Sequence, residues 1–184
     1  AVVAVLVIYG VTVYNSMVGK EESVSTAWSQ VENQYQRRLD LIPNLVNTVK
    51  GYATHESSTL QAVIEARSQA TQIKVDPENL TPEALQQYQQ AQGNVSSALG
   101  RLLIITENYP DLKANQNFLE LQAQLEGTEN RITVARQSFN ETAQDYNTYI
   151  RRFPKNIFAG MSGFDKRPYF EADAGASQAP KVEF

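Results

Sequence analysis

Apolar residues recur about every 3.6 positions from Val24 to Ala53, which is the period of an α-helix. The apolar stripe consists of Val24, Trp28, Val31, Tyr35, the Arg38/Leu39 pair, Ile42, Val46, Val49 and Ala53. Pro43 interrupts the stretch, because proline has no N–H and its ring clashes with the carbonyl of Leu39. Since the stripe keeps its phase across Pro43, the pattern favours one long helix kinked at this residue. The alternative is a helix that stops near Ile42 and a second helix with Pro43 in its first turn.

The segment before this helix, residues 1–19, carries no charge and is mostly aliphatic. A helix that spans a bilayer needs about 20 mainly apolar residues, so we expect residues 1–19 to form most of a transmembrane helix. The competing interpretation is the apolar part of a signal peptide, but no small-residue cleavage site follows it. The phase of the long helix extends back to Met17 and Val13, so the helix is expected to continue into the anchor.

The same period, with capping signals at Thr54 and Thr81, predicts three further helices at about residues 55–74, 82–108 and 112–153, with breaks around Pro77 and Pro110. The last of them would be about 60 Å long at 1.5 Å per residue. Short connections make consecutive helices antiparallel neighbours. We therefore predict an all-α fold, an up-down-up-down antiparallel four-helix bundle with long first and fourth helices, preceded by the transmembrane helix.

The expected organisation is an anchor at residues 1–19, the bundle at 20–153 and an irregular, aromatic-rich tail at 154–184. Because the first helix leaves the membrane, the fourth should return to it. The tail aromatics either dock on the base of the bundle or sit among lipid headgroups, where aromatic and basic side chains are favoured. The membrane-proximal contact is assigned to Arg151, Arg152, Lys155, Phe158, Phe164, Tyr169 and Phe170.

Composition excludes several classes of function. The net charge is −4 and the basic residues are scattered, so nucleic acid is not an expected partner. The absence of cysteine excludes disulfides, thiolate nucleophiles and cysteine-based metal sites. Residues 86–92 are glutamine-rich and nearly uncharged, which indicates either a solvated face or a surface that packs against other copies.

Four polar residues fall on or beside the apolar stripes of the two long helices: Arg38, Glu129, Arg136 and Asn140. A buried charge is costly unless it is paired and hydrogen-bonded. We therefore predict an interior polar network centred on Glu129, with Arg38 or Arg136 as its partner. Such a network could be a ligand or proton site, or it could fix helix register as a buried Asn does in coiled coils, and the structural role is favoured.

The sequence contains no recognisable catalytic or metal-binding motif. His55 is the only histidine, whereas a helical di-iron site requires two and a zincin motif requires a second one after Glu56. A Gly-x-Ser-x-Gly elbow, a phosphate-binding loop and a dinucleotide fingerprint are also absent. We expect no enzyme activity, no cofactor and no metal.

Several stretches resemble the LemA family: YNSMV at 14–18, QYQRRLDLIPNLV at 34–46, ENYPDLKA at 107–114, ENRI at 129–132 and YFE at 169–171. The resemblance implies a bacterial protein with an N-terminal transmembrane helix and a bundle of long helices, and with no settled biochemical activity. One class of members takes part in forming magnetosome membranes, and others are linked to envelope stress and membrane proteolysis.

A long rod with one anchor, a charged fraction of 20% and a Gln/Asn-rich surface suits lateral self-assembly at a membrane. The expected function is that of a non-catalytic, membrane-anchored, self-assembling scaffold or membrane-shaping protein. The alternative is an adaptor or regulator of membrane proteolysis in envelope stress. The expected partners are membrane lipid and further copies, with other membrane proteins left open. The expected location is the bacterial cell membrane, single-pass and N-terminally anchored, with the side of the bundle undetermined.

Overall fold

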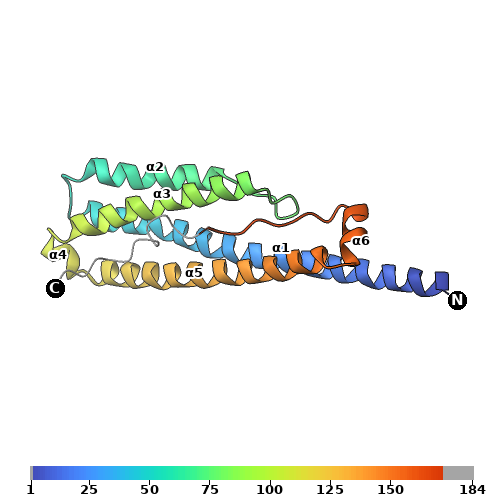
Figure 1. Cartoon of the computed structure of the whole chain (residues 1–184). Helices are drawn as coiled ribbons and strands as arrows, with labels where there is room; N and C mark the ends of the chain where they lie inside the picture. The colour runs from blue at the N-terminus through green and yellow to red at the C-terminus, as the bar shows by residue number, and fades with distance from the viewer. Residues whose placement is uncertain (1, 172–184) are drawn as a thin grey trace, which may run out of the picture.

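The computed structural model describes residues 2–171, and that part of the chain contains six helices and no strand. The helices are α1 (Val2–Lys50), α2 (Ser57–Gln72), α3 (Pro82–Thr106), α4 (Pro110–Lys113), α5 (Gln116–Arg151) and α6 (Lys155–Ser162). The all-α prediction is confirmed. The four longest helices lie side by side, and the N-terminal end of α1 projects beyond the others (Figure 1).

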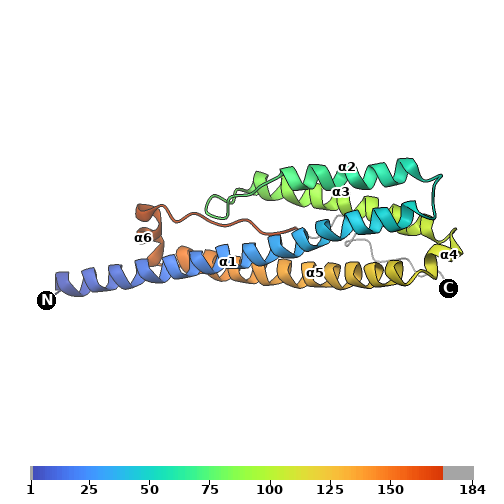
Figure 2. The same ribbon diagram turned by 180° about the vertical axis from the view of Figure 1, so that it is seen from behind.

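Helix α1 is continuous through Pro43, so the alternative of two helices divided at Ile42 is wrong (Figure 2). Proline cannot donate the backbone hydrogen bond that the Leu39 carbonyl would otherwise accept. Arg67 of α2 takes this place, because its Nε–H donates to the Leu39 oxygen at 2.9 Å. The proline therefore frees a carbonyl that attaches α2 to α1.

The core consists of two clusters of buried residues that follow one another along α1. The first extends on α1 from Val13 to Tyr35 and includes Trp28, whose ring lies 5.1 Å from Tyr88 and 5.8 Å from Phe139 between centroids. The second begins on α1 at Leu39 and is almost entirely aliphatic. Arg38 lies between the two clusters in sequence.

The predicted fourth helix, residues 112–153, is divided in the structure. Leu112 belongs to the short helix α4, and α5 begins only at Gln116. Asn115 causes the division, because its Oδ1 accepts the N–H of Phe118 at 3.0 Å and so caps the start of α5. The apolar positions keep a helical period across this cap, so the sequence pattern did not show that the helix is divided.

The expectation of an irregular tail is wrong for residues 155–162, which form α6. Gly163 ends this helix in the left-handed conformation, with φ of 75°, which costs glycine little. Residues 164–171 then run in extended form back along the bundle, and the rest of the predicted tail, 172–184, lies outside the described residues.

The predicted boundary between anchor and bundle at residue 19 does not coincide with the edge of the core. Val13 and Met17 are buried in the first core cluster, and Met17 has no exposed surface. The N-terminal part of α1 is nevertheless long and apolar enough to cross a membrane, and only 11% of its most apolar 18-residue window is buried within the molecule. One continuous helix therefore supplies both the core seam and the apolar projection.

Candidate functional site

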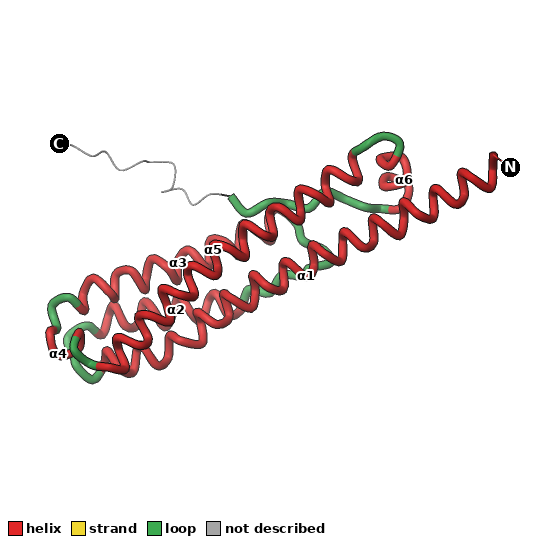
Figure 3. The backbone as a smooth tube through the Cα atoms, turned by 90° about the horizontal axis from the view of Figure 1, so that it is seen from below, coloured by secondary structure: helices red, strands yellow, loops and turns green. Residues whose placement is uncertain are grey.

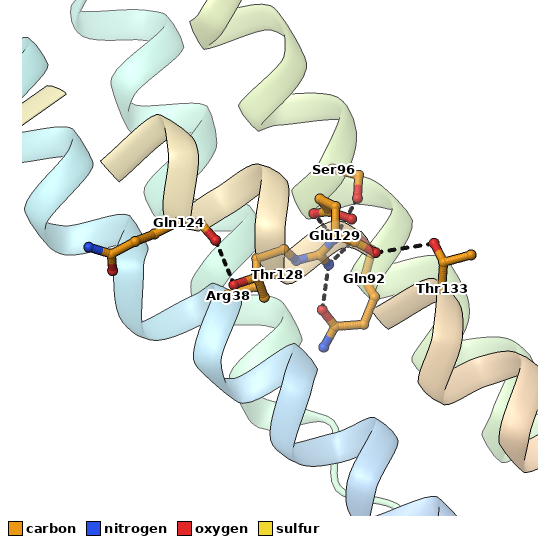
Figure 4. Close-up of polar contacts among 7 residues, drawn as sticks. All are labelled: Arg38, Gln92, Ser96, Gln124, Thr128, Glu129 and Thr133. Atoms are coloured by element: carbon orange, nitrogen blue, oxygen red, sulfur yellow. Dashed lines mark hydrogen bonds and ion pairs between the residues drawn. The ribbon is translucent and has the colours of Figure 1, made fainter. Parts of the chain in front are cut away.

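Arg38 is the centre of the interior polar cluster (Figure 4). Only 1% of its surface is exposed. Its Nη1 donates to Glu129 Oε1 at 2.9 Å and to Ser96 Oγ at 2.6 Å. Its Nη2 donates to both the backbone oxygen and Oε1 of Gln92, at 2.8 and 2.7 Å. One guanidinium of α1 thus connects α3, which carries Gln92 and Ser96, with α5, which carries Glu129.

The four terminal N–H groups of this guanidinium are all engaged by protein oxygens, which leaves only Nε–H without a hydrogen bond in the described structure. Charge-assisted hydrogen bonds of this kind are stronger than neutral ones. A cavity of about 530 Å³ opens onto the cluster and is lined by Arg38 and Glu129 together with α3 side chains including Gln89 and Asn94. The donors of Arg38 are already occupied, so the geometry matches a connection between helices better than an open anion site.

Arg136 and Asn140, predicted to join this network, instead contact the extended segment 164–171. Nη2 of Arg136 donates to the backbone oxygen of Glu171 at 2.7 Å, and its guanidinium lies 5.1 Å from the ring centroid of Phe170. The structure therefore brings Arg38 and Glu129 together, with Arg38 rather than Glu129 at the centre. Arg136 lines the same cavity as Arg38 and Glu129, and both Arg136 and Asn140 hold the backbone of residues 170–171.

Two asparagines of α5 hold this segment by its backbone. Asn147 donates to the Arg167 oxygen and accepts the Arg167 N–H, both at 2.8 Å. Asn140 makes the same pair of bonds to Phe170, at 3.0 and 2.8 Å. Seven residues of helix span about 10.5 Å, and three residues of extended chain span about 10 Å. Because the two spacings match, two asparagines on one face of α5 can both form hydrogen bonds with the backbone of the same extended segment.

Sequence reasoning did not assign this role to Asn147. The signal was present, because Asn140 and Asn147 are seven residues apart and lie beside the apolar stripe of α5. What the sequence did not contain was the location of the partner segment, since extended backbone without an alternating pattern gives no periodic signal.

The residues assigned to the membrane end fall into separate environments. Phe164 and Phe170 are buried in the core, and the Tyr169 hydroxyl accepts a hydrogen bond from Asn147 at 2.8 Å. Phe158 packs on α1, Lys155 Nζ lies 3.6 Å from the Tyr149 ring centroid, and Arg151 and Arg152 are exposed. Three exposed apolar side chains lie at this end, Phe153, Ile157 and Met161, and the last two were missed.

Burial raises the pKa of Tyr146 to about 12, with the Glu21 carboxylate adding to the effect and Arg167 opposing it. Burial likewise raises the pKa of Tyr88 well above its usual range. Both phenols are therefore neutral core groups at physiological pH. Within residues 2–171, no three histidine or carboxylate side chains gather closely enough to hold a metal ion.

A family model and similar known proteins agree on the family that this chain resembles. The sequence model of the LemA family matches residues 27–184. The magnetosome protein MamQ 2 of Paramagnetospirillum magneticum is 27% identical over 177 residues, covering 86% of this chain and 64% of that protein. The magnetosome protein MamQ of Magnetospirillum gryphiswaldense is 29% identical over 180 residues, covering 88% and 66% respectively. The protein LemA of Metamycoplasma hominis is 26% identical over 145 residues, covering 79% and 63%. The chain thus spans less than two thirds of the length of these three relatives.

Proposed function

The chain belongs to the LemA family, and from this premise we propose that it is a non-catalytic protein anchored in a bacterial membrane by α1, where it acts as a self-assembling scaffold. The observation that carries the proposal is the projecting end of α1. Its side chains from Val2 to Val11 are apolar apart from Gly10, and most are exposed beyond the bundle. A surface of that kind is stable in lipid and unfavourable in water.

The rigid part is proposed to be an up-down-up-down bundle of α1, α2, α3 and α5. Support comes from the short connections and from the packing of α1 on α5, of α2 on α3 and of α1 on α2. Arg38 adds a polar connection from α1 to both α3 and α5. A bundle whose helices are connected in this way is rigid, so its orientation is fixed relative to the membrane anchor.

The proposed assembly surface is the exposed part of the glutamine-rich stretch on α3. Gln92 is buried in the Arg38 cluster and Gln89 donates to the Glu171 oxygen, whereas Gln86, Gln87 and Gln90 are exposed. Uncharged amides on a rigid helix can bond to the same face of another copy without charge repulsion. Relatives named as magnetosome proteins are compatible with a role in organising a membrane.

Mass photometry of the full chain extracted in mild detergent tests this proposal. Large particles of regular size are expected, and they should become smaller when Gln86 and Gln90 are both changed to Glu. The matched control changes Gln69 and Gln72, exposed on α2, to Glu and should leave the particles unchanged.

Small particles for the unmodified chain would overturn the scaffold and favour the alternative, an adaptor in membrane proteolysis. The Asn140–Asn147 pair supports that alternative, because it holds an extended segment of the chain mainly through backbone atoms, which any sequence provides.

A further inference from the structure

The short helix α6 lies crosswise on α1, whereas α2, α3 and α5 run along it (Figures 1 and 2). In the view from below, α6 is seen nearly end-on beside α1 (Figure 3). The contact is close because residue 10 is glycine, and a Cβ there would lie 3.1 Å from Cε1 of Phe158. The Phe158 ring also meets the Tyr9 ring edge to face, with centroids 6.0 Å apart.

This contact lies inside the apolar end of α1. Beyond it, toward the N-terminus, α1 carries only exposed apolar side chains: Val2, Val3, Val5, Leu6, Val7 and Ile8. On the other side of it, Val13 and Met17 are buried in the bundle core. Helix α6 therefore marks the point where α1 passes from the proposed membrane into the bundle. A helix that crosses α1 at that point runs along the bilayer surface when the apolar end of α1 is inserted into the bilayer.

The outer face of α6 is apolar. On this helix Met161 is 83% exposed and Ile157 is about half exposed, and Phe153, two residues before the helix begins, is 80% exposed. Ile157 and Met161 lie on one side of the helix because they are four residues apart, and this side is next to the one that carries Phe158. The apolar face thus begins at the contact with α1 and continues outward, where no described residue covers it.

Basic residues flank this helix in the sequence. Residues 151–166 contain four basic side chains, at Arg151, Arg152, Lys155 and Lys166, and a single carboxylate at Asp165, whereas the chain as a whole carries −4. Arg151 and Arg152 are exposed directly before the helix. Long basic side chains can lay their stems on apolar surface while the charge reaches phosphate. This local charge complements anionic headgroups.

From these observations we infer that α6 is an interfacial helix lying flat in the headgroup region of an anionic bilayer. Ile157 and Met161 of α6, and Phe153 just before the helix, enter the upper acyl region, and Arg151 and Arg152 bind lipid phosphate. The inference rests on the proposed anchoring by α1. Because α6 packs on both α1 and α5, it holds the bundle at a fixed tilt to the membrane, a role that a single transmembrane helix cannot perform.

The absence of cysteine in the chain allows a direct test by single-cysteine labelling of the full-length protein. Met161→Cys reports on α6, Leu6→Cys on the projecting end of α1 and Val134→Cys on exposed surface of α5. Each variant carries a bimane fluorophore and is reconstituted into vesicles of phosphatidylcholine and phosphatidylglycerol. Quenching is measured with doxyl groups placed near the headgroup or near the end of the acyl chain.

We expect the label at position 161 to be quenched by the shallow doxyl several-fold more than the label at 134. The label at 6, about 6 Å further along α1 than the contact with α6, should be quenched by the deep doxyl more than the label at 161 is. Quenching at 161 should fall when phosphatidylglycerol is omitted or when Arg151 and Arg152 are both changed to Glu. Quenching at 6 together with a signal at 161 equal to that at 134 would overturn the interfacial helix but leave the anchor. Deep quenching at 161 would also overturn it, and absence of quenching at 6 would overturn the anchor and the inference together.

Discussion

Arg38 shows how one residue can decide the internal order of this fold. It occupies a position in the apolar stripe of α1 and is almost fully buried, which would be unfavourable for an unpaired charge. Three partners on two other helices compensate it, and its guanidinium lies 5.1 Å from the Tyr35 ring centroid. Only one rotation of α3 and α5 relative to α1 offers all of these partners, so the arginine selects that arrangement.

Replacing Arg38 by Ala is therefore expected to lower the free energy of unfolding by about 3 kcal/mol, because the hydrogen bonds are lost and a cavity remains. Arg37→Ala changes the exposed neighbour and should stay within about 0.5 kcal/mol. Urea unfolding in detergent, followed by circular dichroism, measures both. Equal effects of the two substitutions would contradict the role given to Arg38.

Asn147 acts on the backbone of the return segment, so its removal should have a local effect. In Asn147→Ala the N–H of Arg167 loses its acceptor, and its hydrogen exchange should accelerate by about tenfold, equivalent to roughly 1.4 kcal/mol. Hydrogen–deuterium exchange with mass spectrometry on peptides covering 164–171 reports this change. Asn117→Ala, at an exposed position of α5, serves as the control and should leave these peptides unchanged.

At the scale of elements, the connection between α1 and α2 depends on an unusual use of proline. A helix carbonyl normally accepts an N–H from four residues further on. Pro43 supplies none, and the Leu39 carbonyl is satisfied by Arg67 from the neighbouring helix. The proline that interrupts the backbone pattern of α1 thus creates the acceptor by which α2 is attached.

This arrangement predicts energetic coupling between Pro43 and Arg67. Arg67→Met should cost about 1–1.5 kcal/mol in the unmodified protein. The cost should be smaller in a Pro43→Ala background, where the new N–H can bond to Leu39. Thermal and urea unfolding of the four proteins completes the double-mutant cycle, with a coupling of about 1 kcal/mol expected. An identical cost in both backgrounds would show that Arg67 does not depend on the freed carbonyl.

In the whole molecule, the single helix α1 lies in two environments, the core of the bundle and the exposed apolar end. The core seam of α1 reaches Val13, and the exposed apolar projection begins immediately beyond it. The shared helix makes the bundle rigidly continuous with the proposed anchor. The return segment and α6 then enclose the same end, where Tyr14 meets the buried ring of Phe164 at 5.6 Å between centroids.

The two parts of α1 should respond differently to the loss of side-chain volume. Met17→Ala is expected to lower the free energy of unfolding by about 2–3 kcal/mol, because it leaves a cavity in the core. Val7→Ala removes an exposed side chain and should leave unfolding in detergent nearly unchanged. Thermal unfolding monitored by circular dichroism distinguishes them. Similar midpoints for both variants would mean that the core ends before Met17.

The sequence by itself determined the four long helices, the continuity of α1 through Pro43 and the apolar projection, because helix periodicity and apolar length are properties of consecutive residues. It also selected Arg38 and Glu129, since a charge on an apolar stripe requires a partner. Only the tertiary structure decided that Arg136 and Asn140 hold residues 170 and 171, and that α6 crosses α1 at Gly10. Those contacts depend on the rotation of helices about their axes and on the path of an extended segment, neither of which leaves a local period in the chain.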